Sequence, residues 1–361
     1  MVTATISLLS AMLIGFAAHR ASLCNVRAVA ELMGNGSSHM LRSLLQAVLW
    51  MATLSGVLAL AFGVSLQPVG VRAPVTWALA GGWTFGFGAA LNGGCSLSTL
   101  HRLADGELGM GATLLGVVLG LLSWPWLTAF GPSPTLTPVP SPWQRWPELA
   151  PWALLALLAW MAWQLRAMHR QARHPDGGGW LARLLAPSYS LAVGAALLGL
   201  AGGWLFALQG PWSYSGYVRD LLLHRHGLAQ APSGFHALLV AALVAGMVAS
   251  AWQRGSLRWK HPGSAARWAR HAAGGLFMGM GAAMVPGGND TLLLGALPAL
   301  TSTAALAYAS LLVGIASGLM LLRLARVPMA PFTCDATGCS ESPTPTSSSR
   351  TAHPSPTRRR A

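Results

Sequence analysis

Long apolar segments constrain this chain more than any other feature of its sequence. A helix needs about 18–20 apolar residues to cross the hydrocarbon core of a bilayer. Only 9% of the 361 residues are charged and 53% are hydrophobic, whereas soluble domains have about 25% charged residues. The sequence therefore predicts an all-α polytopic membrane protein with about nine transmembrane helices, at 3–19, 44–66, 76–99, 108–130, 149–165, 187–209, 233–252, 272–289 and 299–322.

The basic residues are distributed unevenly between the predicted loops. The formal net charge is +14, but no extended basic stripe carries interleaved aromatic residues, as a nucleic-acid-binding surface would. If the loops after the fifth and seventh spans lie in the cytoplasm, fifteen Lys and Arg residues fall inside and four outside, leaving out the last 22 residues. This positive-inside bias predicts a bacterial inner-membrane protein with its N-terminus outside and its C-terminus in the cytoplasm. No basic residue precedes the first apolar run, which argues against a secretory signal.

The two halves of the chain repeat one glycine pattern. When the chain is shifted by 193 residues, FGFGAALNGGCSLSTL at 85–100 aligns with MGMGAAMVPGGNDTLL at 278–293. Five spans precede the second copy, so the two copies should insert in opposite orientations, as in transporters built from inverted repeats. The alternative is that the repeat only stabilises a helical bundle. The predicted organisation is a first transmembrane repeat at 1–130, a linking span and basic cytoplasmic connector at 131–185, a second transmembrane repeat at 186–326, and a disordered, Ser-, Pro- and Thr-rich cytoplasmic tail at 327–361.

Adjacent glycines interrupt one predicted span in each half, at 93–94 and at 287–288. Unwound backbone at membrane depth is tolerated only where it is buried in protein or lines a polar cavity. The pattern therefore predicts interrupted or re-entrant helices beside a polar gap. New helix N-termini near Ser96 and Asn289 would favour an anion. The alternative for the other glycines of these spans, such as Gly86, is helix packing.

Three polar or reactive residues stand out at the breaks. Cys24 follows the short first span and Cys95 follows the first glycine pair, so the two thiols could approach one another. A buried cysteine is most often an inert small hydrophobe, but two at matched breaks in a cysteine-poor chain favour function. Asp290 follows the second glycine pair, and its structural alternative is a helix N-cap. Cys334 and Cys339, in CDATGC near the C-terminus, fit a redox pair, a sulfur acceptor or exposed thiols without a role.

Three stretches of the chain resemble the YeeE/YedE family of membrane proteins, whose better-understood members take up thiosulfate. GFGAALNGGCSLSTLHRLADGELGMG at 86–111 is similar to the glycine-rich, GGC-containing signature of that family. RASLCNVRAVAEL at 20–32 is similar to its N-terminal cysteine segment, and GGLFMGMGAAMVPGGND at 274–290 to its second copy of the signature. The resemblance covers about residues 1–325.

This resemblance implies a nine-span fold with inverted halves and a central path lined by cysteines. Cys24 and Cys95 match two of the path cysteines, while Gly288 stands where the family has a third. Because of this departure, the substrate implied by the resemblance is either thiosulfate or a related sulfur anion. The predicted substrate-binding residues are Cys24, Cys95, Gly94, Gly288, Asn289 and Asp290.

The predicted function is an inner-membrane transporter for a small sulfur-containing anion, and not an enzyme. The sequence contains no Ser–His–Asp arrangement, Walker loop, HExxH motif or metal-ligand spacing, so no catalytic residue, metal or cofactor is expected. The resemblance adds membrane lipid and a TusA-like cytoplasmic sulfur carrier as partners. The alternatives are a membrane-embedded thiol protein that forms a disulfide or carries persulfide, and a non-transporting scaffold of the same fold.

Overall fold

The computed structural model describes residues 2–129, 135–172, 186–327, 332–335 and 338–341. Most of these residues are helical, and the strands form two short antiparallel pairs. In chain order the elements are α1 Val2–Ala21, α2 Asn25–Asn35, α3 His39–Ala61, β1 Val69–Ala73, α4 Val75–Asn92, α5 Ser96–Ala104, α6 Gly109–Leu122, α7 Trp124–Ala129, β2 Thr135–Val139, α8 Pro142–Arg145, α9 Ala150–Ala172, α11 Leu191–Gln209, α12 Tyr214–Leu223, the 3₁₀ helix η1 His224–His226, α13 Gly234–Arg254, α14 Ala265–Met284, α15 Asn289–Thr291, the π-helix η2 Leu292–Ala296, α16 Ser302–Leu324, β3 Phe332–Asp335 and β4 Gly338–Glu341.

Each of the nine predicted spans overlaps at least one of these helices. Six stretches of the described chain are long and apolar enough to cross a membrane, namely Val2–Asn35, His39–Ala61, Gly109–Ala129, Leu191–His226, Gly234–Arg254 and Ser302–Leu324. The chain is therefore an all-α membrane protein. Nine crossings stay a prediction, because α4, α9 and α14 lie outside those six stretches.

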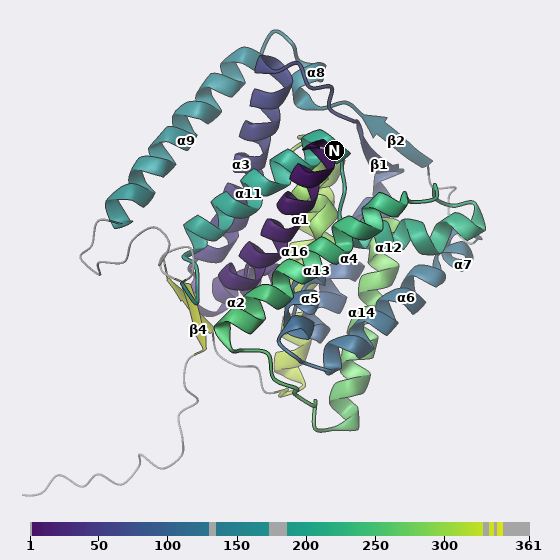
Figure 1. Ribbon diagram of the computed structural model, residues 1–361. Helices are drawn as coiled ribbons and strands as arrows, with labels where there is room; N and C mark the ends of the chain where they lie inside the picture. Colours follow the sequence, from purple (N-terminus) through teal and green to yellow (C-terminus); the bar gives the residue numbers. More distant parts are fainter. Residues whose placement is uncertain (1, 130–134, 173–185, 328–331, 336–337, 342–361) are drawn as a thin grey trace, which may run out of the picture.

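The helices of the two halves of the chain pack against each other. Helix α1 lies against α11 and α13, and α3 lies against α11 (Figure 1). Helix α4 packs against both α14 and α16, and α14 also packs against α6. The two halves therefore share one core and do not form separate domains.

Glycines allow these helices to approach closely. A Cβ atom at Gly86 would collide with the Leu311 carbonyl of α16, and one at Gly279 would collide with the Val117 carbonyl of α6. Small residues at such contacts let the backbones of transmembrane helices meet. The packing interpretation is thus confirmed for the glycines within the spans, and it leaves the glycines at the breaks to be explained separately.

Helix α9 lies at the edge of the bundle, beside α3 (Figure 1). Trp152 is 72% exposed and Trp163 is 62% exposed, as expected for a surface that faces lipid. The sequence predicts the end of the fifth span at residue 165, with the basic connector after it. Arg166 and Arg170 lie on α9, which continues to Ala172 because this segment consists mainly of good helix formers. Residues 173–185 of the predicted connector lie outside the described residues.

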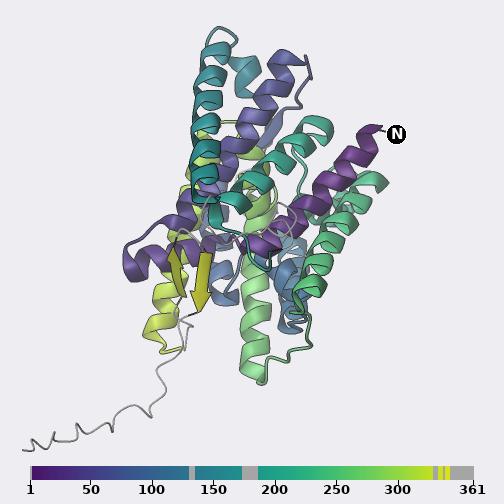
Figure 2. The same cartoon turned by 60° about the vertical axis from the view of Figure 1, so that its left-hand side comes forward.

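The segment after α16 contains a short hairpin. Strand β3 pairs antiparallel with β4, in a register that places Cys334 opposite Cys339. Figure 2 shows this pair near α2, and β3 contacts both α2 and α3. The sequence predicted one disordered tail over 327–361. Its residues 332–335 and 338–341 form these strands, and 342–361 lie outside the described residues.

Candidate functional site

Two helix breaks frame the site, at the positions that the glycine pairs predicted. Helix α4 ends at Asn92, Gly93 has a φ of +77°, and α5 begins at Ser96. In the second half α14 ends at Met284, Gly287 has a φ of +97° and α15 begins at Asn289. Both conformations lie in the region that glycine adopts without steric cost. Helix α15 has only three residues before the π-helical turns of η2, and such π segments are frequent at functional sites.

The two break glycines are expected to tolerate a methyl group differently. Gly93→Ala meets no atom closer than 3.8 Å, so only the positive φ penalises it, by about 1–2 kcal/mol. At Gly287 an added Cβ would also collide with the Thr291 hydroxyl and lie 2.7 Å from its Cβ. Gly287→Ala should therefore lower the free energy of unfolding clearly more than Gly93→Ala, measured by denaturant unfolding of the purified protein. Equal losses would show that the collision at Thr291 is relieved at no cost.

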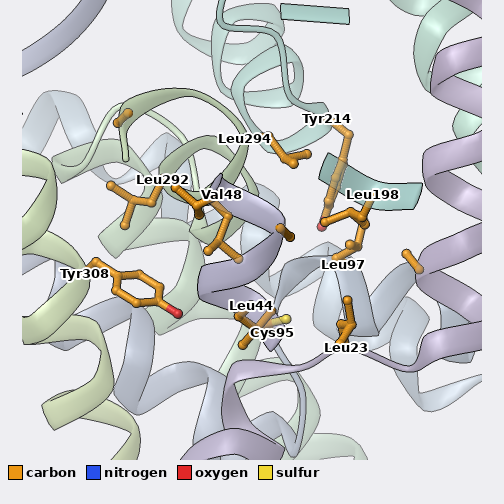
Figure 3. Packing of buried hydrophobic residues seen from close by; sticks show 14 of the residues in the cluster. Leu23, Leu44, Val48, Cys95, Leu97, Leu198, Tyr214, Leu292, Leu294 and Tyr308 are labelled. Atoms are coloured by element: carbon orange, nitrogen blue, oxygen red, sulfur yellow. The ribbon is translucent and has the colours of Figure 1, made fainter. Parts of the chain in front are cut away.

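Cys24 and Cys95 approach one another, as their positions predicted. Cys24 is the N-cap residue of α2 and Cys95 is the N-cap residue of α5. The two thiols lie close enough to interact with each other, and Cys95 Sγ lies 3.4 Å from Ser98 Oγ. Both cysteines are 2% exposed and neither forms a disulfide. Figure 3 shows Cys95 in the buried cluster, into which Tyr308 points its hydroxyl. Two helix N-termini thus bring two free thiols together inside the protein.

Side-chain hydrogen bonds link α2 and α16 to the second break. The Asn25 side-chain amide donates to the Asn289 Oδ1, and the Tyr308 hydroxyl donates to the Asn25 Oδ1 over 3.0 Å. Asn25 directly follows Cys24, and Asn289 is the first residue of α15. Asn289 is 3% exposed. The second break is thereby held beside the helix that carries the first thiol.

Asp290 is a buried hydrogen-bond acceptor between the halves. Its Oδ1 accepts from Ser96 Oγ at 3.1 Å and from Ser215 Oγ at 2.5 Å, and its Oδ2 accepts from the Ser215 N–H at 3.1 Å. The N-cap interpretation of Asp290 is wrong, since Gly288 is the N-cap of α15. Both carboxylate oxygens are already occupied by donors from α5 and α12. Asp290 therefore joins three helix starts instead of capping its own.

The remaining predicted glycines also lie at these starts. The Gly94 carbonyl accepts from the Asn92 side-chain amide at 3.0 Å. The Gly288 N–H donates to Ser215 Oγ at 2.7 Å. A Cβ at Gly288 would lie 2.9 Å from Phe85 Cε2 and 3.0 Å from Ser215 Oγ. The position of the missing third cysteine is thus tightly packed in this chain.

A large cavity reaches from the protein surface to Cys24. Its volume is about 930 Å³, and its walls are formed by α2, the end of α4, α5, the segment 254–262, the start of α14 and the end of α16. Cys24 and Ser98 line it, whereas Cys95 is absent from its lining. Ser98 lies next to Cys95, so the cavity ends against the thiol pair.

The walls of this cavity are strongly basic. Two acidic residues line it, and both are engaged: Asp105 with His19 at 3.0 Å, and Glu107 with Arg102 at 2.7 Å. Burial raises the pKa of Asp105, but hydrogen bonds from His19 and Ser256 outweigh burial, so this pKa lies below its ordinary value. The basic residues that line the cavity are Arg27, Arg102, Arg254, Lys260, Arg267, Arg270 and Arg323. Such an excess of positive charge attracts anions.

Sequence reasoning missed several of the side chains that complete the site. Ser215 and Tyr308 contact residues at the breaks from α12 and α16, and neither lies in the quoted motifs. Asn25 is the exception, because its position directly after Cys24 is a signal that could have been used. Cys334 and Cys339 lie on the hairpin after α16. Within the described residues, no group of three or more His, Cys, Asp or Glu could hold a metal ion.

Comparisons with known proteins identify the family of the chain. Two curated relatives, each named "Probable transporter YedE", come from Salmonella typhimurium strain LT2 and Escherichia coli strain K12 and are 30% and 29% identical over 119 residues. The matched segment is 31% of this chain and 27% of each relative, so the chain spans about a quarter of the length of these relatives. A family model described as "Sulphur transport" matches residues 20–317. That range includes both breaks and both buried cysteines, and the chain therefore belongs to the sulphur transport family.

Proposed function

We propose that this protein is an inner-membrane permease for a small sulfur-containing anion such as thiosulfate. The observation that carries the proposal is the proximity of the two buried thiols, Cys24 and Cys95, at the inner end of a basic cavity. Membership of the sulphur transport family supports the same conclusion. In this proposal the anion passes along a central path and makes transient contacts with the two thiols.

The chemistry of the thiol suits such a path. A thiol is a weak S–H donor and can contact a soft sulfur anion without the desolvation cost of a fixed buried charge. Weak, successive contacts also let the ion leave again. The starts of α2 and α5 add partial positive charge beside the thiols. The backbone at Gly94 and Gly288 and the side chain of Asn289 complete the proposed path, and Asp290 shapes it.

We propose further that the fold consists of two inverted repeats crossing the membrane nine times. The helix contacts support this proposal. If α1, α3, α4 and α6 of the first half correspond to α11, α13, α14 and α16 of the second half, each contact between the halves has a matching contact with the two roles exchanged. Helix α1 packs on α13 as α11 packs on α3, and α4 packs on α16 as α14 packs on α6. Such exchange is expected when two copies of one unit are related by a two-fold axis in the membrane plane.

The basic cavity suggests the direction of the path. It opens on the side of Arg254, Lys260 and Arg267, and the positive-inside rule places this side in the cytoplasm. The N-terminus then lies outside and the C-terminus inside. A cytoplasmic sulfur carrier similar to TusA is the partner that we propose at this opening, where it would receive the released anion.

A membrane-embedded thiol protein is the second candidate, and the proximity of Cys24 and Cys95 also favours it. Two adjacent thiols can lose two electrons and two protons to an oxidant and form a disulfide. Mass spectrometry separates the candidates. A reversible loss of two hydrogens at these cysteines, without any flux of substrate, would favour the redox protein.

Uptake of radiolabelled thiosulfate into proteoliposomes tests the permease. Wild type is expected to exceed protein-free liposomes, and Gly288→Cys is expected to take up more than Gly288→Ala. The alanine variant is the matched control, since it adds the same crowded Cβ near Phe85 and Ser215 without the thiol. Uptake by Gly288→Cys alone would mean a path tuned to another sulfur anion. No uptake by any of the three would favour the redox candidate or the scaffold.

A further inference from the structure

One buried amide holds the backbone on both sides of Cys95. Asn92 is the last residue of α4 and is 1% exposed. Its Nδ2 donates to the Gly94 carbonyl at 3.0 Å and to Thr99 Oγ1 at 2.9 Å. Thr99 Oγ1 donates in turn to the Cys95 carbonyl at 3.0 Å. The first carbonyl belongs to the peptide before Cys95 and the second to the peptide after it. Because peptides are planar, these bonds fix the direction in which the Cys95 thiol projects.

The oxygen of the same amide is held by α6 and α14. Thr113 Oγ1 donates to Asn92 Oδ1 at 2.7 Å, and His271 Nδ1 lies 2.9 Å from that oxygen. The His271 ring also packs on Gly109, where a Cβ would lie 2.9 Å from the ring Cδ2. His271 is in the second half of the chain, on α14, the helix that leads to the second break. A residue of the second half therefore orients the amide that holds the first break.

The hydrogen bonds determine which ring nitrogen of His271 carries a hydrogen. A carbonyl can only accept, so the amide atom that faces the Gly94 carbonyl must be the Asn92 nitrogen. The other amide atom is then the oxygen, which accepts from His271 Nδ1. A ring with hydrogen on Nε2 alone would bring two acceptors within 2.9 Å of each other. His271 Nδ1 must therefore be protonated.

We propose that Asn92 and His271 are positioning residues for the Cys95 thiol, with a hydrogen on His271 Nδ1. Their role in transport rests on the proposed function, in which Cys95 contacts the anion. His271 is 6% exposed and lines the basic cavity, whereas Cys95 does not line it. The chain of hydrogen bonds thus connects the cavity wall to the thiol behind it. Without the His271 donor, the amide is less firmly held and the Cys95 peptides lose their fixed orientation.

Uptake of thiosulfate by three variants of His271 tests this role. His271→Leu and His271→Gln are each expected to reduce uptake about tenfold, the effect of losing one buried hydrogen bond that positions the thiol. His271→Asn should keep most of the uptake, because the amide nitrogen of Asn can occupy the place of Nδ1. The amide nitrogen of Gln reaches the place of Nε2 instead. Asn and Gln carry the same amide group, so they form a matched pair that differs in where the donor lies.

Formation of a disulfide between Cys24 and Cys95 tests the same role without transport. Cys24 lines the cavity, so the thiol oxidant diamide reaches it first and forms an adduct. The Cys95 thiol then displaces the reduced diamide, which has taken two electrons and two protons from the thiol pair. In purified protein this step should slow about tenfold in His271→Leu and His271→Gln, for the same lost hydrogen bond. His271→Asn should react like wild type, as measured by mass spectrometry.

Nitrogen-15 nuclear magnetic resonance of histidine-labelled wild type tests the hydrogen on Nδ1 directly. The His271 signals are those that disappear in His271→Asn, and they should show a protonated Nδ1. A ring with hydrogen on Nε2 alone overturns the proposal, and this measurement needs no variant that might fold poorly.

The outcomes separate the positioning role from the permease proposal. Uptake and disulfide rates that are equal in wild type, His271→Leu and His271→Gln overturn the positioning role. A loss in His271→Asn as large as in His271→Leu overturns it too, since the place of the donor would then not matter. The expected disulfide rates in a protein without thiosulfate uptake would support the positioning role and reject the permease. Size-exclusion profiles identify variants that fail to fold.

Discussion

Cys95→Ala is expected to reduce thiosulfate uptake into proteoliposomes at least about tenfold, because one desolvated contact for the ion is lost. Cys95 is buried at the start of α5, and its thiol lies near that of Cys24. The ion should therefore meet both thiols in succession, and neither can replace the other. Cys24→Ala should give a similar loss.

The hairpin after α16 offers a matched control for this experiment. Cys334→Ala removes a thiol from β3 and Cys339→Ala removes one from β4. Neither thiol lies at the helix breaks. Both variants should transport like wild type. Full uptake in a Cys24→Ser, Cys95→Ser double variant would contradict the relay, because a hydroxyl would then serve as well as a thiol. Loss of uptake in the hairpin variants alone would show that the essential thiols lie in the segment after α16.

Asp290→Leu should lower the free energy of unfolding by at least about 1–3 kcal/mol, the cost of leaving a buried donor without its acceptor. The carboxylate accepts three hydrogen bonds, from Ser96 and from two groups of Ser215. A leucine leaves these donors buried without an acceptor. Asp290→Asn keeps one carbonyl oxygen and should cost less. Denaturant unfolding of the purified variants measures the difference.

Asp220→Asn is the control for charge removal. Asp220 pairs with the adjacent Arg219 and its side chain is 30% exposed, so the loss of this pair should cost no more than about 1 kcal/mol. An Asp290→Leu variant as stable as Asp220→Asn would show that water satisfies the Ser96 and Ser215 donors. Asp290 would then be free to act on the anion directly.

The uptake experiment and the unfolding experiment distinguish residues that contact the anion from residues that stabilise the helix breaks. Cys95 is expected to affect flux with little effect on stability, because a small buried side chain is replaced by a smaller one. Asp290 is expected to affect stability first, because it connects the starts of α5, α12 and α15. A Cys95 variant that lost stability, or an Asp290 variant that lost only flux, would contradict this assignment.

Much of the site could be predicted from local sequence features. The glycine pairs predicted where the two helix breaks lie, because Gly93 and Gly287 have a positive φ, which favours glycine. The same pairs predicted that helices restart at Ser96 and Asn289. The proximity of Cys24 and Cys95 followed from their places at matched breaks. Each of these inferences depends on a few adjacent residues.

Contacts between distant parts of the chain could not be predicted in this way. The interaction of Asn25 with Asn289 and the hydroxyl of Tyr308 joins residues more than 250 positions apart. A tyrosine or serine in an apolar span has no local pattern that reveals its partner. The N-cap alternative for Asp290 fails for the same reason, since its partners Ser96 and Ser215 lie on other helices.

The sequence by itself determined that this chain spans a membrane, where its helices break and which residues stand at the breaks. These properties follow from hydropathy and from backbone sterics, which act over short stretches of chain. Only the tertiary structure decided that the breaks meet, that Asp290 joins them and that a basic cavity ends at Cys24. The physical reason is that packing and hydrogen bonding between helices depend on which faces meet in space, and the spacing of residues along one helix does not specify its neighbours.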